Sequence, residues 1–286
     1  IEKSGESLLV IINDILDFSK IESGKLELLI DRCNIYDLVS QVMNVILFQS
    51  QRKDLELLLN IEPGLPKTIL LDESRIKQVL INLLGNAVKF TDKGEIELKV
   101  EKLLLEDEHI TLRFSVRDTG IGIPQEKQQR IFDAFTQEDS SVSKRFGGTG
   151  LGLTISNNIL KYMESRLSLS SEPQEGSTFC FEIKIPCELD SLDDGEDLNI
   201  NKVLIVDDNE NNRIILQHML AYKNIDSTLA ANGMEALQIL LKGERFDVIL
   251  MDYHMPVISG IETIEKIKEL FSDQEEISPL IVLHTS

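Results

Sequence analysis

Two glycine-rich stretches, DTGIGIP (residues 118–124) and GGTGLGL (residues 147–153), decide the fold of this chain. Glycine has no Cβ, so the backbone there can adopt positive φ and approach a ligand closely. The second stretch runs into LTISNNILKYM (residues 153–163), a pattern typical of a helix. Amide groups at a helix N-terminus attract anions such as phosphate. The two stretches together predict a nucleotide pocket, whereas either one alone would indicate only a glycine-rich turn.

A third segment, RIKQVLINLLGNAVKFT (residues 75–91), lies upstream of both. Its apolar residues recur at steps of three and four, which predicts an amphipathic helix with one buried face. Asn82, Asn86 and Lys89 share a second stripe, so their side chains converge on one side of that helix. Asparagine in mid-helix costs helix propensity. The stripe therefore favours a ligand-binding role over a merely solvated face.

In this order, the segments resemble those of the hybrid sensor histidine kinases. The helix resembles the N box of that family, the two glycine stretches its glycine boxes, and IFDAF (residues 131–135) its phenylalanine box; a receiver-like segment follows from Lys202. The resemblance covers nearly the whole chain. It implies an α/β (α+β) fold class, in which an α/β-sandwich ATP-binding domain is preceded by one helix of a dimerisation four-helix bundle and followed by a truncated doubly wound receiver domain.

The same resemblance divides the chain into four parts. These are the second helix of the dimerisation hairpin (residues 1–24), the catalytic ATP-binding domain (25–186), an acidic linker (187–200) and the N-terminal part of a receiver domain (201–286). We expect the first hairpin helix, with its phosphate-accepting histidine, to lie outside this sequence. Within the catalytic domain, KLELLI (residues 25–30) is interpreted as the first strand.

Composition narrows the function classes. The chain has 286 residues and a net charge of −20, which argues against nucleic acid and against an anionic membrane surface as partners. Its three scattered cysteines suit free thiols in a reducing cytoplasm. No run of residues approaches the length of a membrane span. The composition therefore favours a cytoplasmic segment. The resemblance implies that this segment belongs to a membrane-anchored sensor, forms a homodimer through its dimerisation helices and signals to a downstream phosphotransfer or response-regulator protein.

The resemblance also implies roles in ATP binding. Asp118 would accept a hydrogen bond from the adenine amino group, Asn86 would give an oxygen to Mg²⁺, and Lys89 would supply charge for phosphate. Lys144 and Arg145 lie between the glycine stretches, where the family has its ATP lid. The full set implied for ATP binding is Asn82, Asn86, Lys89, Asp118, Gly120, Gly122, Ile123, Lys144, Arg145, Gly147, Gly148, Thr149, Gly150, Leu151, Gly152 and Leu153.

Asn82 bears on the type of reaction. In the hydrolytic relatives of this fold, a glutamate that activates water occupies the position four residues before the metal-binding asparagine. Asn82 cannot act as a base, which favours phosphoryl transfer to a protein side chain. Two alternatives remain: a hydrolytic ATPase of the same fold, and a nucleotide-binding pseudokinase that serves as a signalling scaffold. The intact N box and glycine stretches argue against the scaffold.

Three aspartates mark the receiver-like segment. Asp207 and Asp208 follow one apolar run, and Asp252 follows a second, Val248–Met251. Ligands of doubly wound sheets bind beyond the carboxyl ends of the strands, so we expect the three carboxylates to meet there and hold Mg²⁺. The resemblance implies that Asp252 is the phosphoacceptor and Thr285 the switch threonine. His109, His218, His254 and His284 lack the context of a phosphoacceptor histidine and are interpreted as structural or exposed.

Overall fold

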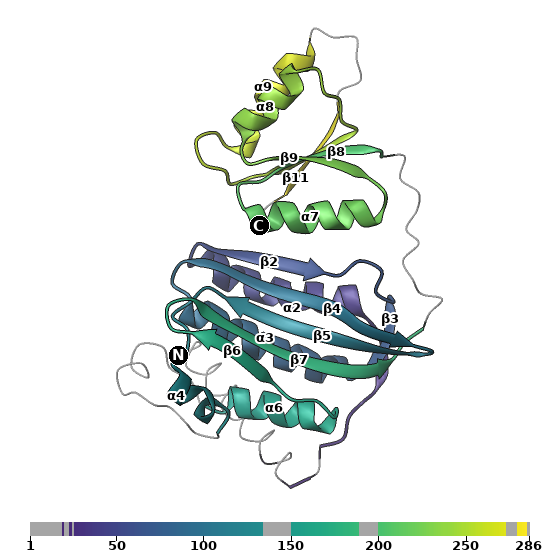
Figure 1. The fold of residues 1–286 in the computed structure, drawn as a ribbon, viewed down its shortest axis with the longest axis vertical. Coiled ribbons are helices and arrows are strands. Elements are labelled where there is room, and N and C mark those ends of the chain that lie inside the picture. The colour runs from purple at the N-terminus through teal and green to yellow at the C-terminus, as the bar shows by residue number, and fades with distance from the viewer. Residues whose placement is uncertain are drawn as a thin grey trace, which may run out of the picture. The chain divides into compact units, whose positions relative to one another are not determined.

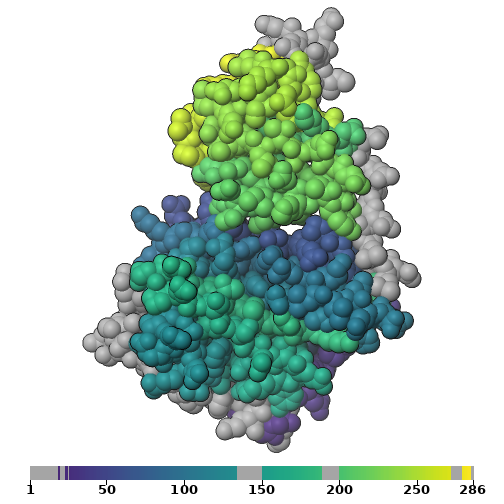
Figure 2. Space-filling view, viewed as in Figure 1, coloured from purple at the N-terminus to yellow at the C-terminus, as the bar shows by residue number. Residues whose placement is uncertain are grey.

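The computed structural model describes residues 26–133, 150–188, 200–272 and 279–284, together with residues 19, 23 and 24. The chain forms two compact units, Ile1–Asp193 and Asp194–Ser286. Each unit is formed by one continuous segment of the chain (Figure 2). The helix expected over residues 1–24 lies almost wholly outside the described residues. No helix among the described ranges is both long and apolar enough to cross a membrane.

The first unit is built on a mixed five-stranded sheet. Its strands, in spatial order, are β2 (Leu55–Ile61), β4 (Gly94–Glu106), β5 (His109–Asp118), β7 (Gly176–Pro186) and β6 (Ser168–Glu172). Only β2 and β4 run parallel, and the other pairs are antiparallel. A separate antiparallel pair joins β1 (Asp31–Asn34) to β3 (Thr68–Leu71).

Helices cover one face of the five-stranded sheet (Figure 1). They are α2 (Ile35–Gln51), α3 (Glu73–Phe90) and α6 (Gly152–Tyr162), and the short α4 (Gln125–Gln128) and η1 (Arg130–Phe132) lie between β5 and α6 in the chain. Burial alternates along the strands: in β5, Leu112, Phe114 and Val116 are buried beneath the helices, while the residues between them are half-buried. This period of two is that of a strand with one covered face.

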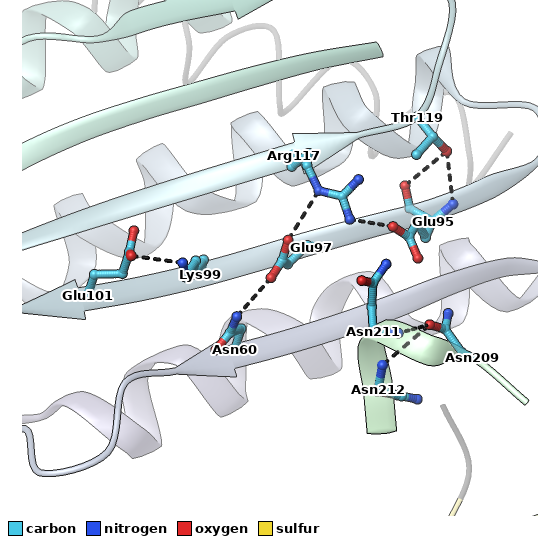
Figure 3. A network of polar contacts seen from close by, with 10 residues as sticks. All are labelled: Asn60, Glu95, Glu97, Lys99, Glu101, Arg117, Thr119, Asn209, Asn211 and Asn212. Carbon is cyan, nitrogen blue, oxygen red and sulfur yellow. Dashed lines mark hydrogen bonds and ion pairs between the residues drawn. The ribbon is translucent and has the colours of Figure 1, made fainter. Parts of the chain in front are cut away.

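The opposite face of the sheet is polar (Figure 3). Arg117 of β5 donates to Glu97 of β4 at 3.1 Å and also pairs with Glu95. Asn60 of β2 donates to the same Glu97 carboxylate at 3.0 Å. These side chains join three neighbouring strands on the face of the sheet opposite the helices. The predicted α/β sandwich of one sheet and one helical layer is therefore confirmed.

The strand predicted at residues 25–30 is wrong. Residues 26–30 lie in no strand, and β1 begins only at Asp31. Leu29 and Ile30 are 77% and 53% exposed, so their apolar side chains do not mark the buried face of a sheet. The Leu29 amide donates instead to the carboxylate of Asp72 at 3.0 Å. The segment is thus held to the start of α3 by a side chain rather than by strand pairing.

The second unit is a parallel sheet with helices on both faces (Figure 1). Its described strands, in spatial order, are β11 (Leu280–His284), β10 (Val248–Asp252), β8 (Lys202–Val206) and β9 (Asp226–Ala230), and its described helices are α7 (Glu210–Tyr222), α8 (Gly233–Leu241) and α9 (Gly260–Ser272). Alternate residues of β8 enter different cores: Leu204 packs with α8 and α9, and Val203 packs with α7. The predicted doubly wound architecture is confirmed.

Candidate nucleotide and phosphoacceptor sites

The N-box helix and the second glycine box meet at Asn82. Asn82, Asn86 and Lys89 are all half-buried on α3. The Asn82 amide donates to the hydroxyl of Ser156 on α6 at 2.9 Å, and Ser156 is itself only 1% exposed. A Cβ added at Gly152 would lie 2.2 Å from Asn82 Oδ1. A side chain at position 152 would therefore displace the Asn82 carboxamide, where the N-terminus of α6 approaches the polar stripe of α3.

The N-terminus of α6 carries no side-chain cap. Its cap residue, Leu151, is 1% exposed and makes no capping hydrogen bond through its side chain. Gly150 precedes it with φ of +71°. Leu153, in the first turn, packs partly buried against the core. The first amide groups of α6 are thus oriented by buried leucines and are suited to an anion.

Asp118 lies at the end of β5 and is 6% exposed. Burial raises the pKa of its carboxyl, while the amide of Gly120 donates to Oδ1 at 2.8 Å and opposes that rise. A Cβ at Gly120 would lie 2.5 Å from the carbonyl oxygen of Phe90 and 2.9 Å from Thr91 Oγ1. The buried Thr91 hydroxyl has no partner among the described residues. The Asp118 carboxylate, an acceptor, and the Thr91 hydroxyl thus lie close together. This arrangement fits hydrogen bonds to the base of a nucleotide.

The rest of the first glycine box is held against the hairpin of β6 and β7. Gly122 has φ of +65°, and a Cβ there would lie 1.9 Å from the carbonyl oxygen of Glu172. The amide of Ile123 donates to the Ser171 hydroxyl at 2.8 Å. This stretch is thus fixed by close backbone approach, and only glycine fits at position 122.

Lys89 and Lys53 lie at the other end of α3. Burial lowers the pKa of Lys89, whose ammonium lies 4.9 Å from the ring centre of Phe90. Lys53 Nζ donates to the carbonyl oxygens of Val88, Lys89 and Thr91 at 2.7, 3.1 and 3.0 Å. Sequence reasoning missed Lys53, because a single lysine in a loop forms no pattern. The only available signal is the general preference of helix C-termini for cations.

Part of the predicted site falls outside the described residues. This applies to Lys144, Arg145, Gly147, Gly148 and Thr149 of the nucleotide site and to Thr285 of the receiver. In the phenylalanine box, Phe132 packs partly buried against the core, and its carbonyl oxygen accepts a hydrogen bond from Thr154 of α6 at 3.0 Å. Phe132 therefore links the segment before the second glycine box to α6.

The receiver site lies at the carboxyl ends of β8, β10 and β11. Asp207 and Asp252 are each 1% exposed, and ligand atoms of Asp207, Asp252 and His284 all lie within 4.8 Å of one another. Asp208 is exposed and is not part of this group. The structure therefore brings together two of the three expected aspartates and adds His284, which the sequence suggested was only structural or exposed. The sequence analysis did not use the position of His284 at the end of an apolar run, which places it at the end of β11, parallel to β10.

Electrostatics at this site favour a cation. Burial raises the pKa of Asp207 to about 6, and the charges of Asp252 and Asp208 act in the same direction. Asp207 is oriented by the Asn209 amide at 2.8 Å and by the Asn212 side chain at 3.0 Å. Asp252 Oδ1 is buried without a hydrogen-bond partner in the described part of the chain. Buried, clustered carboxylate oxygens of this kind fit a divalent cation such as Mg²⁺.

The backbone around these aspartates is tightly packed. Asn209 caps α7 by accepting from the amides of Asn211 and Asn212 at 2.9 and 3.3 Å, so α7 begins at Glu210 (Figure 3). A Cβ at Gly260 would lie 2.1 Å from the carbonyl oxygen of Asp252. Gly260 therefore allows α9 to start directly against the end of β10.

Two family models match the chain. The model for histidine kinase-, DNA gyrase B- and HSP90-like ATPases matches residues 71–187, and the model for the response regulator receiver domain matches residues 203–283. The first range contains Asn82, Asn86, Lys89 and Asp118, and the second contains Asp207 and Asp252.

Curated relatives and a solved structure agree with these matches. The signal transduction histidine-protein kinase BarA of Escherichia coli K12 is 44% identical over 65% of this chain and 20% of its own length. The autoinducer 2 sensor kinase/phosphatase LuxQ of Vibrio vulnificus is 38% identical over 93% of this chain and 32% of its own. The structure of full-length ShkA in complex with AMPPNP is 27% identical, with a TM-score of 0.74, and covers 98% of this chain and 60% of the ShkA chain.

The chain thus spans about a fifth to a third of the length of these curated relatives. It carries a histidine-kinase-type ATPase domain followed by a receiver domain. On these grounds, the chain belongs to the hybrid sensor histidine kinases.

Proposed function

We propose that this chain binds Mg·ATP between α3 and α6, passes the γ-phosphoryl group to a histidine of a dimerisation domain, and relays that group to Asp252 of its receiver. The observation that carries the proposal is the contact between Asn82 and Ser156. This contact places the polar stripe of α3 against the uncapped N-terminus of α6. Phosphate oxygens bound at the helix N-terminus would then lie within reach of Asn86 and Lys89.

Each end of the nucleotide has a proposed partner. The Asp118 carboxylate would accept a hydrogen bond from the adenine amino group, and Thr91 Oγ1, orphaned in the described chain, would complete the contacts to the base. The side-chain oxygen of Asn86 would bind the Mg²⁺ that accompanies the phosphates, and the Lys89 ammonium would pair with a phosphate oxygen.

Position 82 favours transfer over hydrolysis. An asparagine amide cannot accept the proton of an attacking water, and the amide nitrogen of Asn82 is engaged by Ser156. The proposed acceptor is instead a neutral imidazole nitrogen, which attacks the γ-phosphorus while the bond to the bridging oxygen breaks and ADP leaves. The two asparagines and the helix N-terminus would position the reactants and stabilise their charge, which is the main task of a protein in phosphoryl transfer.

The second transfer would take place in the receiver. An Asp252 oxygen would attack the phosphorus of the phosphohistidine, so that a P–O bond forms as the P–N bond breaks and the imidazole recovers its neutral form. Bound Mg²⁺ would supply neutralisation of the charge shared by the aspartates and the phosphoryl oxygens. Asp207, held by Asn209 and Asn212, is the proposed anchor of the cation.

The larger assembly is also part of the proposal. A homodimer would form through the helix over residues 1–24, and a downstream phosphotransfer or response-regulator protein would receive the signal. Mg²⁺ and ATP are the proposed cofactor and substrate. LuxQ of Vibrio vulnificus is a sensor kinase, and this similarity supports a cytoplasmic placement of the chain next to a membrane-anchored sensor.

The test of the relay uses Asp252→Asn in a polypeptide that carries this chain together with the acceptor histidine. With γ-labelled ATP, the wild type should carry acid-labile label on histidine and acid-stable, base-labile label on the receiver. Asp252→Asn should lose only the second label. The control is Asp226→Asn, at the exposed start of β9, which should keep both labels. Wild-type labelling of the receiver in Asp252→Asn would refute Asp252 as the acceptor.

The same assay separates the two alternatives. Release of inorganic phosphate from ATP without labelled histidine would identify a hydrolytic ATPase of this fold. Binding of ATP with neither label nor phosphate release would identify a nucleotide-binding scaffold. Each outcome replaces the kinase proposal with a defined activity.

A further inference from the structure

His284 is placed beside the receiver aspartates by strand pairing. β11 runs parallel to β10, and in their register His284 is the direct partner of Asp252. The amide of Tyr253 donates to the carbonyl oxygen of His284 at 2.8 Å, which fixes the backbone of the histidine. β8 lies on the other side of β10, and Asp207 follows its last residue. Three neighbouring strand ends therefore deliver two carboxylates and one imidazole to one point.

The imidazole has no ordinary partner at this point. His284 Nε2 and Asp252 Oδ1 are both buried atoms without a hydrogen bond to any described residue. The distance from His284 Nε2 to Asp207 Oδ2 is 3.7 Å, which exceeds that of a hydrogen bond. A buried polar atom without a hydrogen bond costs free energy of folding. We therefore expect a bound group that contacts both His284 Nε2 and Asp252 Oδ1.

The spacing fits a shared cation. Two donor atoms at about 2.1 Å from one metal ion lie roughly 3 to 4 Å apart, according to the angle between them. The 3.7 Å between Asp207 Oδ2 and His284 Nε2 falls in this range, and Asp252 contributes a ligand atom within 4.8 Å of both. An imidazole nitrogen and two carboxylates form a nitrogen-and-oxygen donor set.

We propose that His284 Nε2 is a protein ligand of the receiver's divalent cation, together with Asp207 and Asp252, and that the site therefore prefers Mn²⁺ and similar first-row cations to Mg²⁺. The preference follows because Mg²⁺ favours oxygen ligands, whereas imidazole suits first-row transition metals. This inference rests on the cation binding that the proposed relay requires. It adds a ligand and a metal selectivity that carboxylates alone would not give.

The test is pulsed electron paramagnetic resonance of Mn²⁺ bound to the 286-residue chain without nucleotide. The wild type should show coupling of the manganese electron spin to a directly bound nitrogen, a signal that needs no variant. His284→Gln, which offers an oxygen in place of the nitrogen, should lose that coupling. Its Mn²⁺ affinity should fall by about tenfold or more, since even residues that only orient a metal ligand are worth that much. Its Mg²⁺ affinity should fall much less.

His254→Gln is the matched control. His254 is exposed on the loop that follows β10, so its replacement should leave the nitrogen coupling unchanged. Asp207→Asn shows where Mn²⁺ binds. If this variant no longer binds Mn²⁺, the ion in the wild type is bound at the receiver site.

Wild-type Mn²⁺ that is bound through Asp207 but shows no nitrogen coupling would overturn the inference, as would coupling that survives in His284→Gln. The relay is read separately, by the base-labile label that a small phosphoryl donor such as acetyl phosphate leaves on Asp252. That label without nitrogen coupling would refute the role of His284 alone. Nitrogen coupling without that label would refute the relay alone.

Discussion

Asn82 and Asn86 lie one turn apart on α3, yet we assign them different tasks. Asn82 is tied to α6 through Ser156 and approaches the Cα of Gly152 so closely that a side chain there is excluded. Asn86 is the proposed metal ligand. The spacing of four residues predicted that the two would share one side of the helix. Only the tertiary structure distinguishes the two residues, because Asn82 is the one that donates a hydrogen bond to α6.

The proposed role of Asn86 predicts a metal-dependent defect. Asn86→Ala should weaken ATP binding strongly in Mg²⁺ and much less in EDTA, because the lost contact runs through the metal. Calorimetric titration of ATP in the two buffers measures both affinities. Asn60→Ala, on the polar face of the sheet, is the control and should change neither. An equal loss of affinity in both buffers would remove Asn86 from the metal.

The buried Ser156 predicts an effect on turnover. Ser156→Ala leaves the Asn82 amide without its acceptor, which costs on the order of 1 kcal/mol and lets the side chain rotate. We expect slower labelling of the acceptor histidine with little change in the dissociation constant of ATP. Ser156→Thr keeps the hydroxyl and should restore the rate. A parallel loss of ATP affinity and rate in Ser156→Ala would show that the hydroxyl supports the fold rather than the geometry of Asn82.

At the scale of the element, side chains hold α3 at both ends. One belongs to the residue directly before the helix, and the other comes from a loop distant in sequence. Asp72 caps its N-terminus, accepting from the Arg75 amide at 3.1 Å. Lys53 binds three carbonyl oxygens at its C-terminus. The cap at Asp72 lies just before Arg75, where the predicted helical pattern begins. The lysine is 36 positions away from Lys89, and its role follows only from the fold.

The hydrogen bonds of Lys53 predict that its replacement destabilises the first unit. Lys53→Met keeps much of the apolar stem but leaves three helix-end carbonyls without the ammonium. The free energy of unfolding of the first unit should fall by about 1 to 3 kcal/mol, as expected for hydrogen bonds to a charged group. Urea denaturation measures this, with Lys93→Met at an exposed position as the control. An unchanged midpoint would mean that water replaces the ammonium without cost.

Element boundaries show where sequence patterns are informative. The apolar run LELLLNI forms the strand β2, Leu55–Ile61. Residues 26–30 show a similar apolar content but form no strand. The difference lies in the partner: β2 pairs with β4 along its whole length, whereas the Leu29 amide is taken by Asp72. Periodicity describes a face and does not reveal whether an adjacent strand exists.

At the scale of the whole molecule, each of the two units carries its own site, and the buried acids of the second unit make its stability dependent on pH and metal. Asp207 has an ordinary pKa of 3.8 and a pKa of about 6 in the fold. Between these values, the folded state holds a proton that the unfolded state has released. Stability must therefore decrease as pH rises through this window.

This predicts a measurable slope. In EDTA, the unfolding midpoint of the second unit should fall between about pH 4 and pH 6, with a ceiling on the order of 3 kcal/mol for a group shifted this far. Asp207→Asn should flatten the slope, and a divalent cation should raise the wild-type midpoint at neutral pH. Scanning calorimetry resolves the transition by its metal dependence. A midpoint in EDTA that rises over this window would show that Asp207 is ionised at no cost.

The sequence by itself determined the order of the two domains and most helices and strands of each core, and it predicted the residues of the nucleotide site. It could do so because glycine clusters, helical stripes and apolar runs are local patterns with a fixed physical period. The same patterns correctly predicted Asp207 and Asp252 at neighbouring strand ends.

The tertiary structure alone decided which groups from distant segments share a site. Lys53 reaches α3 from a loop, Ser156 holds Asn82 from another helix, and His284 replaces Asp208 beside the buried aspartates. None of these residues belongs to a periodic pattern. Their positions depend on strand order and helix packing, which bring atoms within a few ångströms of one another across long stretches of sequence. The physical reason is that hydrogen bonding and metal binding act through distance in space, which the order of residues along the chain does not specify.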